Sequence, residues 1–168
     1  LPKRYFETDL ARLEREGVRV RALGRREGLS KELIRLLDQA QSRTAGNDSF
    51  HLNIAFNYGG QADIVDAARR FAEQVAAGTA SPADLDEARF TGLLSSSGAP
   101  PPDLIVRPSG EQRLSNFLLW EAAYAEFVFQ DVLWPDYGEE HLRAALAEFA
   151  ARDRRYGAIV ADDVLAAG

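Results

Sequence analysis

The chain has 168 residues, of which 46% are hydrophobic and 27% charged, and this ordinary globular usage is enough for one core. A net charge of −6 argues against a broad nucleic-acid-binding surface, because such surfaces need clustered positive charge. The absence of cysteine excludes disulfides and thiolate metal sites. No apolar run approaches the roughly 20 residues of a transmembrane segment, and the N-terminus lacks a signal-peptide layout. We therefore expect a soluble, cytoplasmic α/β protein, a single domain over residues 1–168 with a flexible tail at 158–168.

The first elements follow from hydrophobic periodicity. Phe6, Leu10 and Leu13 recur at helical spacing and predict an N-terminal helix. Residues 18–23 alternate apolar and basic side chains, as a strand does. Ser30 is placed to cap a second helix. The buried stripe expected for that helix is Leu33, Ile34, Leu36, Leu37 and Ala40.

The middle of the chain repeats this strand and helix pattern. Apolar residues alternate over 51–56 and predict a strand, and a helix is expected over 61–77. Ser81 and Pro82 favour the start of a further short helix, and a polar loop follows at 95–102. The buried stripe expected for the longer helix is Ile64, Val65, Ala68, Phe71 and Val75.

The last third adds two strands and two helices. We expect a strand over 104–106, a helix that begins at Ser115, a strand over 127–129 and a final helix that contains Leu142, Leu146 and Phe149. Strands that alternate with helices predict a mainly parallel sheet flanked by helices. In such sheets ligands lie beyond the carboxyl ends of the strands, so Asn57 and Arg107 are expected at one pocket.

Residues 103–137 carry the strongest chemical signal. Arg107 ends a strand, a Pro-Ser-Gly turn follows, and Arg113 comes just before the helix expected at Ser115. Guanidinium groups can clamp phosphate oxygens in a bidentate manner, and a helix N-terminus favours the same anion. Glu126 follows at the expected end of that helix, and a carboxylate near a diphosphate indicates a bridging cation such as Mg²⁺.

Each of these residues also has a simpler interpretation. A single arginine is more often a surface ion-pair partner than a ligand, Ser115 alone is an ordinary N-cap, and Glu126 alone is an ordinary helix-end charge. Asn57, Gly59 and Gly60 are also typical of a plain turn after a strand. The combination of two arginines, turn and cap favours anion binding.

Two stretches also resemble a known family. Residues 103–137 resemble the C-terminal signature of the cis-prenyltransferases, the family of undecaprenyl diphosphate synthase, and LNIAFNYGG at 52–60 resembles that family's Asn-Tyr-Gly-Gly motif. The resemblance runs from about Asp9 to Gly157. Nothing in the chain resembles the family's N-terminal motif, whose aspartate binds magnesium. We therefore expect about the last two thirds of such an enzyme, with the N-terminal part and the catalytic aspartate absent.

The resemblance implies a reaction and a role for each candidate residue. The family joins isopentenyl diphosphate to an allylic diphosphate such as farnesyl diphosphate and makes long polyprenyl diphosphates such as undecaprenyl diphosphate, a lipid carrier of cell-wall synthesis. By position, Arg107, Arg113 and Ser115 would bind the diphosphate of isopentenyl diphosphate, and Glu126 would bind Mg²⁺. Asn57, Gly59 and Gly60 would complete the substrate site.

The family resemblance also implies a homodimer, with the aromatic stretch 117–134 as its interface, and transient contact with a membrane surface. Three positions depart from the family pattern, because Arg25, Gln61 and Pro108 replace an aspartate, an arginine and a threonine. Two alternatives stay open: a non-catalytic, diphosphate-binding accessory subunit or inactive module, and an unrelated phosphate-binding α/β domain.

Overall fold

The computed structural model describes residues 3–153. The chain divides into two compact units, Leu1–Ala99 and Pro100–Gly168. The single domain expected over residues 1–168 stays a prediction, and the tail expected at 158–168 lies outside the described residues.

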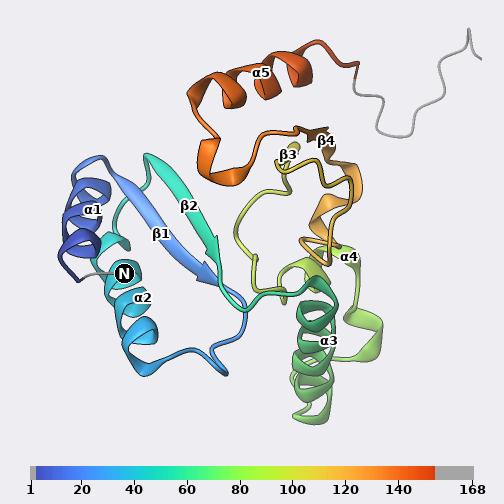
Figure 1. Cartoon of the computed structure of the whole chain (residues 1–168). Coiled ribbons are helices and arrows are strands. Elements are labelled where there is room, and N and C mark those ends of the chain that lie inside the picture. The colour runs from blue at the N-terminus through green and yellow to red at the C-terminus, as the bar shows by residue number, and fades with distance from the viewer. Residues whose placement is uncertain (1–2, 154–168) are drawn as a thin grey trace, which may run out of the picture. The chain divides into compact units, whose positions relative to one another are not determined.

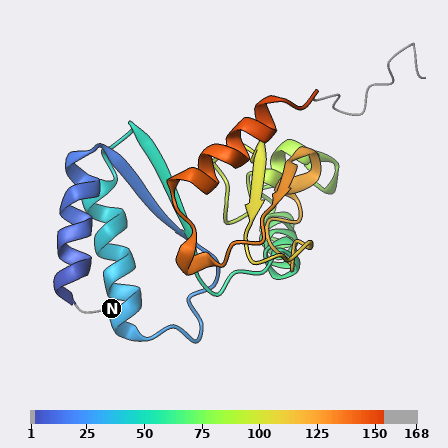
Figure 2. The same ribbon diagram turned by 45° about the horizontal axis from the view of Figure 1, so that its top comes forward.

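The first unit contains a two-stranded parallel sheet formed by β1 (Val18–Leu23) and β2 (Phe50–Ala55), which pair in register along their whole length. The helices α1 (Lys3–Arg15) and α2 (Lys31–Thr44) lie side by side against the two strands (Figures 1 and 2). These four elements confirm the predicted order of helix and strand to within about two residues. The cap predicted for α2 is also confirmed, because Ser30 Oγ accepts a hydrogen bond from the Leu33 amide at 3.2 Å.

The core of this unit lies between the helices and β1. Side chains of α2 also form hydrogen bonds with the edge of β1 that does not pair with β2. The core cluster consists of Leu10, Val18, Val20 and Ala40. Thr44 Oγ1 accepts a hydrogen bond from the Val20 amide at 2.9 Å and donates one to the Ala40 carbonyl at 2.7 Å. Gln41 Oε1 accepts from the Ala22 amide at 3.0 Å. An edge strand exposes amides without partners, so these two side chains provide hydrogen bonds that a third strand would otherwise supply.

Three helical segments complete the first unit: α3 (Gly60–Ala76), the 3₁₀ helix η1 (Pro82–Asp84) and α4 (Glu87–Thr91). The predicted helix start at Ser81 is confirmed, because its side chain caps η1 by accepting from the Ala83 amide at 3.3 Å.

The predicted buried stripe of α3 is partly wrong. Phe71 is buried as expected, but Val65 is 52% exposed and Ala68 is also exposed. Its buried face instead includes Asp63, Ala67 and Phe71. The reason is that α3 packs toward α4, where the Arg89 guanidinium lies 5.5 Å from the centre of the Phe71 ring.

The second unit contains β3 (Leu104–Arg107) and β4 (Glu126–Phe129), which form another parallel pair. The chain continues through the 3₁₀ helix η3 (Trp134–Asp136) into α5 (Glu139–Ala150), which lies beside β4 (Figure 1). Val128 is almost completely buried. The two strands and the final helix confirm the predicted elements.

The helix predicted to begin at Ser115 is wrong. The chain forms turns over residues 115–120 and then one 3₁₀ helix, η2 (Glu121–Tyr124). Ser115, Asn116 and Leu118 have φ angles of 49°, 65° and 46°. A right-handed α-helix requires φ near −60°, so this segment is not α-helical.

The fold class is confirmed as α/β with parallel strands flanked by helices. Within residues 3–153 the four strands form two separate two-stranded sheets, one in each unit. No helix in this part of the chain is both long and apolar enough to span a bilayer. The expectation that the fold lacks an N-terminal part stays a prediction.

Candidate functional site

A pocket of about 290 Å³ in the second unit contains three of the predicted site residues, Arg107, Arg113 and Ser115. Arg107 is the last residue of β3, and the other two lie in the segment that follows the strand. The remaining lining residues are apolar: Ile105, Val106, Leu114, Phe117, Phe127 and Phe129. The pocket therefore combines two guanidinium groups with an apolar wall.

The two arginines make different contacts. Arg107 Nη1 donates a hydrogen bond to the carbonyl oxygen of Arg113, so it holds the loop after β3 against the strand. The Arg113 guanidinium forms an ion pair with Glu111, and its side chain is 65% exposed. Because a guanidinium has five N–H donors, neither contact uses up the donors of its arginine.

The Ser-Gly turn after β3 does not offer its amides to the pocket. The Ser109 amide donates to the Val132 carbonyl at 2.8 Å, and the Gly110 amide donates to the Gln130 carbonyl at 3.0 Å. The helix dipole expected at Ser115 is absent as well, since no α-helix begins there. Positive charge at this pocket therefore comes from the guanidinium groups.

Glu126 lies apart from these residues. Side chains alternate along a strand, so Phe127 and Phe129, which line the pocket, point to the face of β4 opposite to Glu126. The Glu126 carboxylate forms an ion pair with Arg152 at 2.7 Å, and Arg152 Nη2 also donates to the Phe127 carbonyl at 2.8 Å. Hydrogen bonds to Glu126 and Glu148 raise the pKa of Arg152. Among residues 3–153 no group of three or more acidic or histidine side chains could hold a metal ion. The side chains described here thus do not by themselves form a magnesium site.

Sequence reasoning missed Arg152. Its spacing from Glu148 indicates only a helical ion pair, and nothing local predicts the contact with Glu126, which is 26 residues away in the sequence.

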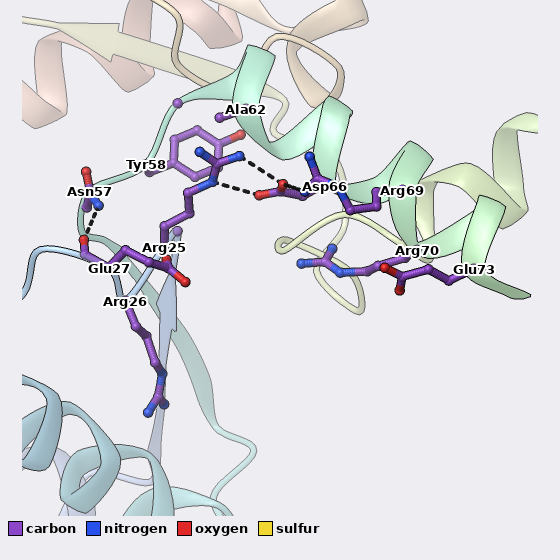
Figure 3. A pocket seen from close by; sticks show the side chains of 12 residues that line it. Arg25, Arg26, Glu27, Asn57, Tyr58, Ala62, Asp66, Arg69, Arg70 and Glu73 are labelled. Atoms are coloured by element: carbon purple, nitrogen blue, oxygen red, sulfur yellow. Dashed lines mark hydrogen bonds and ion pairs between the residues drawn. The ribbon is translucent and has the colours of Figure 1, made fainter.

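The first unit has a larger pocket of about 940 Å³, formed where β1 and β2 end and α3 begins (Figure 3). It contains Asn57 and Gly59, while the third predicted residue of this motif, Gly60, is buried as the first residue of α3. The other lining residues are Gly24, Arg25, Arg26, Glu27, Tyr58, Ala62, Asp66, Arg69, Arg70 and Glu73. Its lining is therefore much more highly charged than that of the pocket in the second unit.

The loops that follow β1 and β2 are locked together at the main chain. A Cβ atom on Gly24 would lie 2.2 Å from the carbonyl oxygen of Phe56, so only glycine allows this approach. The Arg25 amide donates to the Asn57 carbonyl at 3.3 Å. Asn57 adopts a left-handed conformation with a φ of 46°, and its Nδ2 donates to the Glu27 carbonyl at 2.7 Å.

Arg25 also reaches α3 through its side chain (Figure 3). Its Nε and Nη2 atoms each lie 2.8 Å from an oxygen of Asp66, and Arg69 Nη1 lies 2.8 Å from the same carboxylate. The hydrogen bond from Arg25 lowers the pKa of Asp66, while partial burial opposes this shift. The Arg26 side chain points away from Asp66 and forms its own bidentate pair with Asp38.

Sequence reasoning noted Arg25 only as a departure from the family pattern and did not single out Asp66. A signal was present, because Arg25 follows a strand end and a carboxylate lies in the second turn of the helix that follows the next strand. Asn57 and Arg107 belong to different units, so their convergence on one pocket stays a prediction.

Comparison with known proteins identifies the family. Residues 1–157 match the family model described as "Putative undecaprenyl diphosphate synthase". The chain belongs to this family. It is the family of the cis-prenyltransferases that the two motifs predicted, and the predicted resemblance is confirmed.

Relatives of the chain carry prenyltransferase names. It is 62% identical over 168 residues to an isoprenyl transferase of Caulobacter vibrioides, and the match covers 100% of this chain and 65% of that protein. It is 46% identical over 159 residues to an isoprenyl transferase of Bacillus subtilis, with 95% of this chain and 61% of the relative covered. The chain thus spans about two thirds of the length of the curated relatives it matches.

Two solved structures share the fold. Lavandulyl diphosphate synthase from Lavandula x intermedia, in complex with dimethylallyl diphosphate, matches with a TM-score of 0.87 and 38% identity, over 91% of this chain and 66% of that chain. A probable undecaprenyl diphosphate synthase from Campylobacter jejuni matches with a TM-score of 0.76 and 30% identity, over 92% of this chain and 70% of that chain.

Proposed function

We propose that this chain supplies the isopentenyl diphosphate site of a cis-prenyltransferase. The complete enzyme would condense isopentenyl diphosphate with an allylic diphosphate such as farnesyl diphosphate and make a long polyprenyl diphosphate such as undecaprenyl diphosphate. The observation that carries the proposal is the pocket that contains Arg107, Arg113 and Ser115 beside an apolar wall.

The chemistry of that pocket suits a small molecule with one charged and one apolar end. Guanidinium groups recognise phosphate oxygens through paired N–H donors. The side chains of Ile105 and Leu114 would contact a branched five-carbon chain. A diphosphate held at the arginines would therefore orient the alkene, which saves much of the entropy cost of the condensation.

The proposed reaction forms one carbon–carbon bond. The allylic C1–O bond breaks and its diphosphate leaves, the alkene of isopentenyl diphosphate attacks C1, and the proton on C2 of the isopentenyl group is lost. In this step Arg107 and Arg113 hold the diphosphate that stays on the growing product, and Ser115 supplies a hydroxyl donor beside them. Such ionising reactions depend mainly on electrostatic stabilisation.

We also propose that Asn57, Gly59 and Gly60 belong to the substrate site. Gly59 caps α3 without a side-chain hydrogen bond, so the first amides of this helix face the turn. Amides at a helix N-terminus favour negatively charged ligands, which supports a phosphate near this turn.

The proposal includes Mg²⁺, which would neutralise diphosphate charge when bound. Glu126 is its proposed protein ligand on the family motif alone, and one oxygen of its carboxylate is paired with Arg152. The described side chains do not form a metal site, so the proposed reaction contains no step that depends on a placed cation.

Exposed aromatic residues in the second unit support the proposed homodimer. Trp134 is 72% exposed and Tyr124 68% exposed, and Phe117 and Phe129 are also exposed. Large aromatic side chains are enriched at protein interfaces, so residues 117–134 are the proposed contact. We also propose that the enzyme is cytoplasmic. Because its product is lipid-like, it would make transient contact with a membrane surface.

Isotope-labelled isopentenyl diphosphate tests the proposal with the full-length protein. We expect Mg²⁺-dependent incorporation of label into polyprenyl diphosphate, and loss of isopentenyl diphosphate binding in Arg107→Ala. Binding by the wild type without incorporation would instead support the accessory-subunit alternative. No binding by the wild type would contradict both, while the match to the family model already rules out an unrelated phosphate-binding domain.

A further inference from the structure

We propose that Arg25 is a positioning residue that fixes the turn at residues 57–60 relative to α3 through its bidentate ion pair with Asp66. This inference rests on the proposed function, because it concerns the substrate turn of that site. It adds a structural role for a position at which the chain departs from the family pattern.

The turn is held at both ends by Arg25. At the start of the turn, the Arg25 amide donates to the Asn57 carbonyl at 3.3 Å. Beyond its end, the Arg25 guanidinium makes two 2.8 Å hydrogen bonds to Asp66, six residues after Gly60 in α3. One residue therefore links the loop after β1, the turn after β2 and the helix that follows (Figure 3).

The two parallel hydrogen bonds fix orientation as well as distance. A planar guanidinium facing a carboxylate allows little rotation, whereas a lysine ammonium would act as a single point charge. The Gly24 contact with Phe56 and the bond from Asn57 to Glu27 keep the two loops together. Rotation of α3 against these loops is therefore the motion that the Arg25 side chain restricts.

Loss of Arg25 would leave Asp66 with one cationic partner. Arg69 also contacts Asp66 at 2.8 Å, so the carboxylate keeps a cationic partner when Arg25 is removed. The expected defect is thus a loosened turn, since the Asp66 carboxylate keeps a cationic partner. Gln61, another departure from the family pattern, lies within the same linked segment and carries no charge.

The test uses the full-length enzyme with Arg25→Ala, Arg25→Lys, Asp66→Asn and the double variant Arg25→Ala/Asp66→Asn. A matched control is Asp38→Asn, which breaks the equivalent bidentate pair of the neighbouring Arg26 and lies outside the pocket lining. We expect kcat to fall about tenfold or more in Arg25→Ala, because small misplacements of substrate groups are costly. Arg25→Lys should recover only part of this loss, the double variant should lose no more than the larger single loss, and Asp38→Asn should match the wild type.

Amide hydrogen exchange tests the role of Arg25 independently of the proposed condensing activity. Amide hydrogen exchange over residues 58–62 should become faster in Arg25→Ala and Arg25→Lys and remain unchanged in Asp38→Asn, whether or not the enzyme condenses isopentenyl diphosphate. Unchanged exchange in Arg25→Ala, or equal acceleration in Asp38→Asn, would overturn the positioning role. A wild-type enzyme without condensing activity, but with the expected exchange pattern, would contradict only the proposed function.

Discussion

Thr44→Val should destabilise the first unit although the two side chains have nearly the same shape. Thr44 is fully buried, and its hydroxyl accepts from the amide of Val20, a residue that is only 3% exposed. Valine cannot accept this bond, so a buried strand amide loses its partner, which costs about 1–3 kcal/mol. The Ala40 carbonyl loses only the extra hydrogen bond from the hydroxyl. For a chain of this length the melting temperature should fall by about 2–4 °C per kcal/mol.

Urea denaturation of the full chain measures the loss of stability, and hydrogen exchange of the Val20 amide locates it. Thr44→Ser is the matched control, because it keeps the hydroxyl and removes one methyl group, at a cost of about 0.8 kcal/mol. Exchange at Val20 should accelerate more in Thr44→Val than in Thr44→Ser. A Thr44→Val chain that is as stable as the wild type, with the Val20 amide equally protected, would refute the assignment of this hydrogen bond.

Three further predictions concern the site and its surroundings. Arg113→Ala in the full-length enzyme should raise the KM for isopentenyl diphosphate about 10-fold to 100-fold and lower turnover, because a charge-assisted hydrogen bond contributes about 1.5–3 kcal/mol; unchanged steady-state kinetics would contradict the phosphate clamp. Hydrogen bonding by Arg25 lowers the pKa of Asp66 in the folded chain, so this pair stabilises the fold above the unfolded pKa of about 4 and stops doing so as pH falls through the lower folded value. The difference in unfolding free energy between wild type and Arg25→Ala should therefore be constant from pH 5 to 8 and shrink below about pH 4. A difference that grows on acidification would contradict a lowered pKa of Asp66 in the folded chain. Asp63→Ala should lower the free energy of unfolding by about 1–3 kcal/mol in denaturant titrations, because the buried carboxylate accepts hydrogen bonds from the Ser95 amide and hydroxyl at 3.0 and 2.8 Å. An unchanged free energy of unfolding would mean that water replaces the carboxylate as the partner of Ser95.

Local patterns were sufficient to predict most elements. Alternating residues identified β1, and the Ser30 cap with its apolar stripe identified α2, because both signals are contained within a few consecutive residues. The same reasoning failed at Ser115, where a capping residue precedes an apolar run but the backbone adopts left-handed conformations. A cap signal favours a helix without excluding other turns, so longer-range contacts decide such a segment.

For the candidate site, too, the sequence was sufficient to predict some features and insufficient for others. Residue type and order were enough to bring Arg107, Arg113 and Ser115 together as candidates, and the three line one pocket, while their phosphate-binding role stays a prediction. The partners of charged side chains could not be predicted in this way. Arg25 and Asp66 are 41 residues apart, and Glu126 pairs with Arg152 because of how the strand and the end of α5 pack. Composition and spacing determine which chemical groups a chain carries, whereas packing alone determines which of them meet, because those pairs are joined by three-dimensional contacts between distant segments.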